Sequence, residues 1–147
     1  MPTSASKSSK PRPAVAERPR ASSNFLVDLG AGNPRAESAG FSEVIFPTLP
    51  VEAAKGDALA PPHLILRRAV TGALDLHAWW RQARQGMAPQ RRVLKVMLLD
   101  DDRRGVVWTW RFRNVRPVSL TYSPLRAMEA AILMETLELA FDDVEIS

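Results

Sequence analysis

Hydrophobic and polar positions alternate most clearly over residues 106–113 of this 147-residue chain. On a strand, one face would carry Val106, Trp108, Trp110 and Phe112, and the other would carry Arg111 and Arg113. Residues 93–99 form an apolar run before this segment, and the polar residues 100–105 lie between the two. This pattern predicts a β-hairpin with a loop of about six residues. Asn114 is the expected bend or bulge, after which alternation resumes over 115–122.

Three shorter apolar segments earlier in the chain also predict extended structure. They cover residues 25–29, 39–51 and 63–67. Glycines and prolines separate them, and Pro47 and Pro50 exclude a helix in the second segment. Strands therefore dominate the N-terminal half of the folded region.

One helix is predicted between Thr71 and Gly86. Leu76, Trp79, Trp80 and Ala83 recur at three- and four-residue spacing, which places them on one helical face. Thr71 is the expected N-cap, and Asp75 in the first turn suits the positive end of the helix dipole. Two tryptophans on one short helix indicate that the helix lies against an apolar surface, most simply a sheet.

The local signals conflict in residues 125–141. This segment is rich in Ala, Leu, Met and Glu, which favour helix. Leu133, Leu137, Leu139 and Phe141 also fit an alternating stripe, which favours a strand. The residues alone leave both possibilities open.

Residues 1–24 differ in composition from the rest of the chain. They contain five basic residues against Glu17, which accounts for the whole net charge of +4, together with several prolines and serines. Such a segment buries too little apolar surface to offset the entropy of ordering it. We therefore expect a disordered basic arm over 1–24 and a single domain over 25–147.

The residues that catalysis or cofactor binding would need are missing or scattered. The chain has no cysteine, and its two histidines, His63 and His77, have no acidic partners at metal-ligand spacing. The acidic run 100–102 lacks the other ligands of a calcium loop, so we interpret it as a solvated turn. No phosphate-binding loop or nucleophile elbow is present, and no apolar run approaches the roughly 20 residues of a membrane helix. We expect no catalytic, cofactor or metal site and no membrane insertion.

A small nucleic-acid-binding β-domain with a basic arm is the alternative from a different functional class. Tryptophans beside arginines can hold single strands by stacking and charge. Here the alternation puts Trp108 and Trp110 on the opposite face from Arg111 and Arg113. A core role for the tryptophans is the better interpretation.

Four sequence blocks, taken in order, resemble a known family. They are Ala39–Val44, then Leu64–Thr71 before the tryptophan-bearing helix, then Val107–Val118, and finally Glu135–Ala140. Together they resemble the inner tail-tube protein family of contractile phage tails and contractile injection systems. The similarity extends over about residues 25–144.

The resemblance implies a mainly β (α+β) fold, in which two packed antiparallel sheets form a barrel-like tail-tube domain with one packed helix. It implies a strand over the segment matching 131–140. It also implies a structural virion component rather than an enzyme, self-assembling as a homohexamer whose stacked rings form a channel. Implied partners are further copies of the chain, the sheath and the baseplate or spike proteins, with cargo or DNA in the lumen. Assembly in the bacterial cytoplasm and then residence in a phage tail or tail-like particle would follow.

The resemblance and the alternation together single out two groups of residues. The candidates for family motif and assembly are Gly40, Phe41, Arg67, Asn114, Glu135 and Leu137. The expected core anchors are Trp79, Trp80, Trp108, Trp110 and Phe112.

The chain departs from the family between Glu52 and His63. Family members usually carry a longer insertion there, whereas this connection is short and ends in two prolines. A tube-initiator or baseplate-adaptor ring of the same machine is therefore an alternative to an ordinary tube subunit.

Overall fold

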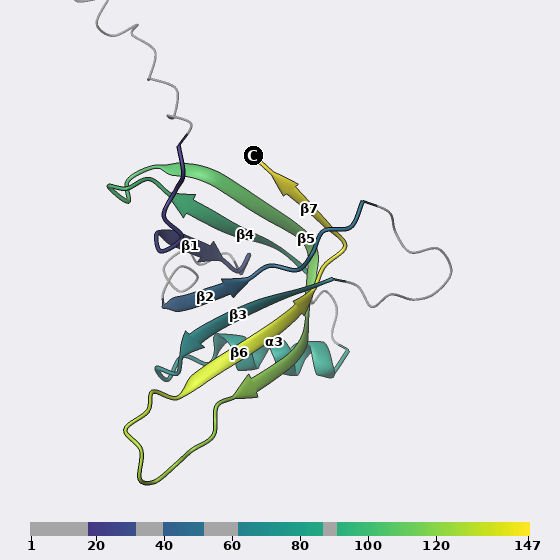
Figure 1. Cartoon of the computed structure of the whole chain (residues 1–147). Coiled ribbons are helices and arrows are strands. Elements are labelled where there is room, and N and C mark those ends of the chain that lie inside the picture. Colours follow the sequence, from purple (N-terminus) through teal and green to yellow (C-terminus); the bar gives the residue numbers. More distant parts are fainter. Residues whose placement is uncertain (1–17, 32–39, 52–61, 87–90) are drawn as a thin grey trace, which may run out of the picture.

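The computed structural model describes residues 18–31, 40–51, 62–86 and 91–147 (Figure 1). The element order is β1 (Phe25–Asp28), β2 (Phe41–Ile45), β3 (His63–Ala69), α3 (Asp75–Arg84), β4 (Arg92–Leu99), β5 (Val106–Tyr122), β6 (Met134–Ala140) and β7 (Asp143–Ile146). The expected strands and helix are therefore present, and the hairpin of β4 and β5 turns over residues 100–105 as predicted.

All strand pairs are antiparallel, and β5 belongs to two sheets. Its first half pairs with β4 and β7, giving a first sheet in the order β1-β4-β5-β7. Its second half pairs with β6, giving a second sheet in the order β5-β6-β3-β2. The two sheets share one core, but β1 and β2 do not pair. The mainly β fold of two sheets is thus confirmed, whereas the sheet is not closed into a barrel.

Asn114 marks the point where β5 passes from one sheet to the other. Its φ is 54°, in the left-handed region, and the β4–β5 register shifts between the pairs Leu94–Phe112 and Arg92–Val115. An extra residue in one strand reverses the side-chain alternation beyond it. Phe112 and Val115 are consequently both buried although they are three positions apart. The predicted bend at this position is confirmed.

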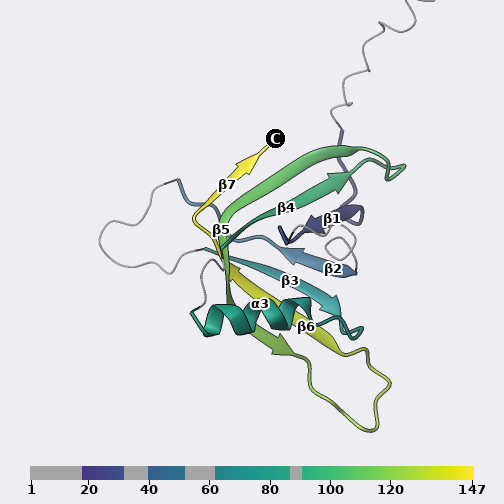
Figure 2. The same cartoon turned by 180° about the vertical axis from the view of Figure 1, so that it is seen from behind.

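The helix α3 lies across the core-facing side of the second sheet (Figure 2). Leu76 and Trp79 are fully buried, and the Arg92 guanidinium lies 4.2 Å from the centroid of a Trp79 ring. The predicted N-cap at Thr71 is wrong, because Gly72, with φ 103°, turns the chain first and the cap position falls on Leu74. The Leu74 side chain has no atom that could accept a hydrogen bond, so the helix begins without a side-chain cap.

The expected aromatic anchors divide into buried and exposed residues. Trp79 and Phe112 are in the core, whereas Trp80 and Trp110 are only partly buried. Trp108 is 44% exposed, so its expected role as a core anchor is wrong for the single chain. The alternation correctly assigned its face, but this end of the β4–β5 hairpin extends beyond the other sheet. Val106 is also exposed, and it lies beyond a register shift between Leu98 and Leu99 at this end of the hairpin.

The C-terminal conflict resolves in favour of strand. Residues 134–140 form β6 between β3 and β5, with Glu135, Leu137 and Leu139 buried on one face. Residues 123–133 form the connection before it, and β7 is a further short strand that the pattern did not predict. No helix in the described part of the chain is long and apolar enough to cross a membrane.

Candidate functional site

The second sheet carries a polar face on the side opposite α3. In β3 and β6, buried residues alternate with partly exposed ones, so alternate side chains point away from the core. We call this surface the polar face; its residues are Glu43, Ile45, His63, Ile65, Arg67, Ser119, Thr121, Thr136 and Glu138. Figure 1 looks onto this side, which no described element covers.

Hydrogen bonds tie the polar face together across the strands. Arg67 donates from Nη1 to Glu43 Oε1 at 3.0 Å and from Nε to Thr136 Oγ1 at 3.3 Å. His63 Nδ1 lies 2.6 Å from Glu138 Oε1, and Ser119 donates to Glu138 Oε2 at 3.1 Å. The hydrogen bond with His63, supported by that from Ser119, lowers the pKa of the Glu138 carboxyl. The face is therefore a partly exposed, internally paired surface spread over four strands.

Both edges of the second sheet are open within the described chain. One edge is β2, and the other is the second half of β5, residues 116–122. The β2 edge carries a register shift between Phe41 and Glu43, and Pro117 lies in the β5 edge. Bulges and prolines on exposed edges disfavour indiscriminate pairing with other chains. Two open edges nevertheless make this sheet capable of continuing into a neighbouring copy.

A buried ionic cluster joins the second sheet to α3. Arg68 on β3 donates from Nε to Glu135 Oε1 on β6 at 2.5 Å, and its two Nη groups donate to Asp75 at the start of α3. The Arg68 guanidinium also lies 5.3 Å from the centroid of the Phe41 ring. Burial tends to lower the pKa of Arg68, but the hydrogen bonds to Asp75 and Glu135 outweigh it and the pKa is raised. The cluster stays charged and fixes the helix on the sheet that bears the polar face.

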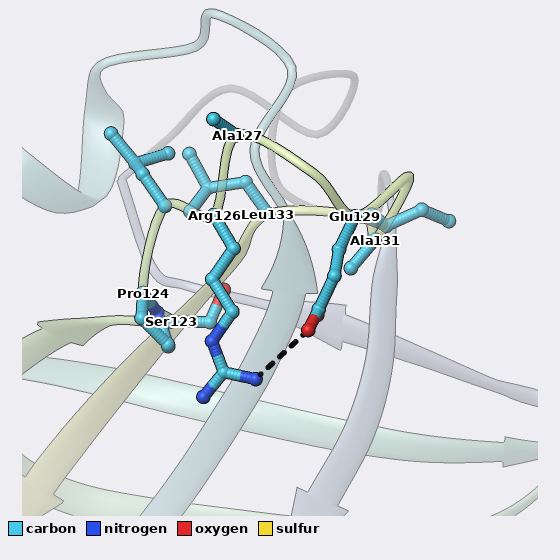
Figure 3. Close-up of a pocket in the computed structure, with 9 residues that line it drawn as sticks. Ser123, Pro124, Arg126, Ala127, Glu129, Ala131 and Leu133 are labelled. Carbon is cyan, nitrogen blue, oxygen red and sulfur yellow. Dashed lines mark hydrogen bonds and ion pairs between the residues drawn. The ribbon is translucent and has the colours of Figure 1, made fainter.

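The β5–β6 connection forms an open hollow of about 690 Å³ at one end of the second sheet (Figure 3). It is lined by Ser123, Pro124, Leu125, Arg126, Ala127, Glu129, Ala131, Ile132 and Leu133. Arg126 and Glu129 point toward each other, with Nη1 and Oε1 3.5 Å apart. The hollow is open rather than enclosed, and its polar groups are one exposed ion pair and Ser123, so it lacks the convergent buried polar groups of a ligand site.

Comparisons with known proteins identify the family and support the fold described above. The family model of the T4-like virus tail tube protein gp19 matches residues 21–145, which is nearly the whole described chain. The chain belongs to this tail tube family. The resemblance recognised from the four sequence blocks is therefore confirmed.

Three solved structures have the same fold as this chain. A chain of the sheath–tube complex of an extracellular contractile injection system, PVC, shares 22% identity over 89% of this chain and 93% of that chain, with a TM-score of 0.68. A chain of the anti-feeding prophage tube-terminating cap shares 20% identity over 90% and 93%, with a TM-score of 0.71. A chain of the anti-feeding prophage baseplate shares 22% identity over 90% and 97%, with a TM-score of 0.66. A search of curated proteins found no significant match.

The candidate motif residues occupy different structural positions. Gly40 precedes β2 with a φ of 84°, which favours glycine, and Phe41 lies under Arg68. Arg67 belongs to the polar face, and Leu137 is fully buried. That these residues take part in assembly stays a prediction.

Asn114 and Glu135 hold two junctions of the fold. Asn114 Nδ2 donates to Asp142 Oδ2 at 2.9 Å where β5 changes sheets, and Glu135 pairs with Arg68. Sequence reasoning missed Arg68 and assigned Asp75 only to the helix dipole. The signal was present, because Arg68 shares a strand face with Leu64 and Leu66, where a charge needs a partner.

The described residues that precede β1 contact the β4–β5 turn. The Arg18 Nη2 and Asp101 Oδ2 atoms lie 2.5 Å apart, and Arg20 and Asp100 lie 3.3 Å apart. Arg103 donates to Asn24 Oδ1 at 2.9 Å. The described part of the arm is thus held before β1 begins, while residues 1–17 lie outside the described chain. Within the described residues, Asp100 and Asp101 belong to no group of three or more side chains that could hold a metal ion. The other histidine, His77, lies beside Trp80.

Proposed function

We propose that this chain forms hexameric rings that stack into the inner tube of a contractile phage tail or tail-like injection system. The observation that supports the proposal best is the pair of open edges on the second sheet. Because this sheet has four antiparallel strands, its two edge strands run in opposite directions. The β2 edge of one copy would therefore meet the β5 edge of the next copy in antiparallel register throughout a ring.

Such head-to-tail pairing repeats until it closes and then leaves no free edge in the inner layer. The core-facing side of the sheet is already covered by α3 and the first sheet. The polar face would then line a water-filled lumen through which cargo or DNA could pass. This arrangement gives the chain a structural rather than a catalytic role.

The proposed partners follow from the same arrangement. Further copies would complete the ring, and the sheath and the baseplate or spike would contact its outside and its ends. The similar chains come from sheath–tube, cap and baseplate complexes, which supports partners of these kinds. The subunit would assemble in the bacterial cytoplasm and end in the particle.

A tube-initiator or baseplate-adaptor ring is the second candidate. The short connection over residues 52–62 favours it, and the fold is as similar to the cap and baseplate chains as to the tube chain. The two candidates differ in whether the pure protein polymerises.

Negative-stain electron microscopy and mass photometry of the purified full chain test both. Six-fold rings with long tubes support the tube subunit, and rings that need a baseplate partner to stack support the adaptor. A chain that stays monomeric at high concentration, even with its sheath and baseplate proteins present, contradicts both. Salt-sensitive binding of DNA that needs residues 1–24 would instead favour the nucleic-acid-binding alternative.

A further inference from the structure

The β5–β6 connection exposes three large apolar side chains. Leu125 is 84% exposed, Met128 97% and Ile132 73%. We call these three residues the loop patch. Apolar side chains gathered on one protruding segment are typical of a surface that contacts another protein.

Hydrogen bonds at its base hold the connection in place. Ser123 N donates to Met134 O, and Met134 N donates to Ser123 Oγ, both at 2.9 Å. Val70 N donates to Leu133 O at 2.9 Å, which ties the connection to the end of β3. With the Arg126–Glu129 ion pair across its tip, the loop patch is presented on a defined backbone.

A second exposed apolar segment follows β2. Phe46 is 41% exposed and Leu49 48%, and the Phe46 ring packs against Trp110 with centroids 4.7 Å apart. We call residues 46–51 the β2 extension. The loop patch and the β2 extension lie at opposite ends of the strands of the second sheet in both views (Figures 1 and 2).

Lateral pairing between subunits uses the sides of the strands, so the strand ends are left facing along the ring axis. Each ring would therefore present the loop patch on one axial face and the β2 extension on the other. Identical rings stacked in the same orientation bring these two surfaces together, and a head-to-tail contact that does not close continues into a filament. A second copy can thus cover both surfaces at once.

We propose that the loop patch binds the β2 extension of a second copy in the adjacent ring. This inference rests on the ring described under the proposed function. The contact is apolar and axial, and it is distinct from the edge pairing that closes the ring.

The first test compares variants of the full chain. Met128→Ser with Ile132→Ser, and separately Leu49→Ser, should leave rings intact and raise the protein concentration needed for stacking by roughly ten-fold or more. Val106→Ser is the matched control, since Val106 is 50% exposed, about as much as Leu49, and begins β5 beside the β4–β5 turn of the first sheet. It should stack as the wild type does.

Cross-linking identifies the partner directly, because the chain contains no cysteine. A variant with both Met128→Cys and Leu49→Cys, treated with a short bis-maleimide, should give a ladder on a denaturing gel that continues beyond six chains. The two single-cysteine variants should give no such ladder.

Three results would overturn the inference without touching the ring: loop variants that stack as the wild type does, a ladder that stops at six chains, or cross-links only to another protein of the particle. Loss of the ring itself in the loop variants would also overturn it, by making the patch a lateral contact. Absence of rings in the wild type would instead refute the proposed function, and the inference with it.

Discussion

Arg68 and Glu135 face each other across β3 and β6, each only 4% exposed, with Nε and Oε1 2.5 Å apart. Removing one partner of a buried ion pair leaves the other charge unpaired in a site of low polarity. Since Asp75 also binds Arg68, the cluster couples two strands and the helix. The cluster therefore contributes to the stability of the second sheet as a whole.

We expect Glu135→Leu to lower the free energy of unfolding by about 3 kcal/mol, because Arg68 keeps only the Asp75 partner. Urea denaturation measures the change. Glu43→Leu is the control, since the Glu43–Arg67 pair is exposed and should contribute less than about 1 kcal/mol. Adding Arg68→Met to Glu135→Leu should recover part of the loss. Equal effects at Glu135 and Glu43 would contradict a buried role.

Urea denaturation should give different losses of stability for alanine substitutions of Trp79 and Trp108. Trp79→Ala removes a fully buried side chain and should cost about 3–5 kcal/mol. Trp108→Ala removes a side chain that is nearly half exposed and should cost about 1 kcal/mol or less in the monomer. Losses of similar size would show that Trp108 is covered within the single chain.

Substitutions of Asn114 test the backbone conformation at the bend where β5 passes between the two sheets. Asn114→Ala and Asn114→Gly both remove the hydrogen bond to Asp142, but only alanine is strained at a φ of 54°. We expect the alanine variant to be less stable than the glycine variant by about 1 kcal/mol. Thermal denaturation of the two variants measures the difference, and a more stable alanine variant would mean that residue 114 leaves this conformation.

The Asp142 carboxylate should contribute to the pH dependence of the free energy of unfolding. The hydrogen bond from Arg116, with that from Asn114, holds the pKa of Asp142 below its usual range. Its stabilising effect is therefore present above the unfolded-state pKa and is lost as pH falls through the lower folded-state pKa.

We expect Asp142→Asn to destabilise the protein at neutral pH by less than about 1 kcal/mol, because Asp142 is half exposed and solvent screens it. The difference from the wild type should vanish in acid and shrink at high salt. Asp143→Asn, at a neighbouring exposed carboxylate, is the control. A difference that grows as pH falls would have the wrong sign.

The features predictable from the sequence are those encoded by local patterns. Alternation over 106–113 and the spacing of Leu76 and Trp79 depend only on side-chain direction within one element, and both were correct. The strand β6 needed the family resemblance, because its leucines and glutamates suit either structure. Its place between β3 and β5 decides in favour of strand, and no local pattern encodes that pairing.

The missed features depend on how distant elements meet. Arg68, Asp75 and Glu135 are separated in sequence and come together only when β3, β6 and α3 pack. Trp108 was assigned to the correct face, but how far the core extends along β5 depends on the other sheet. Likewise β7 is short and half acidic, and it forms because β5 offers a free edge beside Trp110–Arg113.

Tyr122 is the last residue of β5, at the open edge where we expect ring closure. Ser123 N donates to Met134 O, so the N–H of residue 123 points toward β6. Backbone groups of successive strand residues point to opposite sides, so the Tyr122 N–H points toward the open edge. Tyr122→Pro removes this donor while leaving the hydrogen bonds to β6 in place, and proline is tolerated on an edge strand.

We expect the Tyr122→Pro variant to fold but to remain monomeric by mass photometry, whereas Tyr122→Thr, which keeps the N–H, should still form rings. Both variants lose the exposed tyrosine ring, so their difference isolates the backbone hydrogen bond. Circular dichroism and thermal denaturation establish that both are folded. Rings formed equally well by both variants would show that subunits meet through some surface other than the β5 edge.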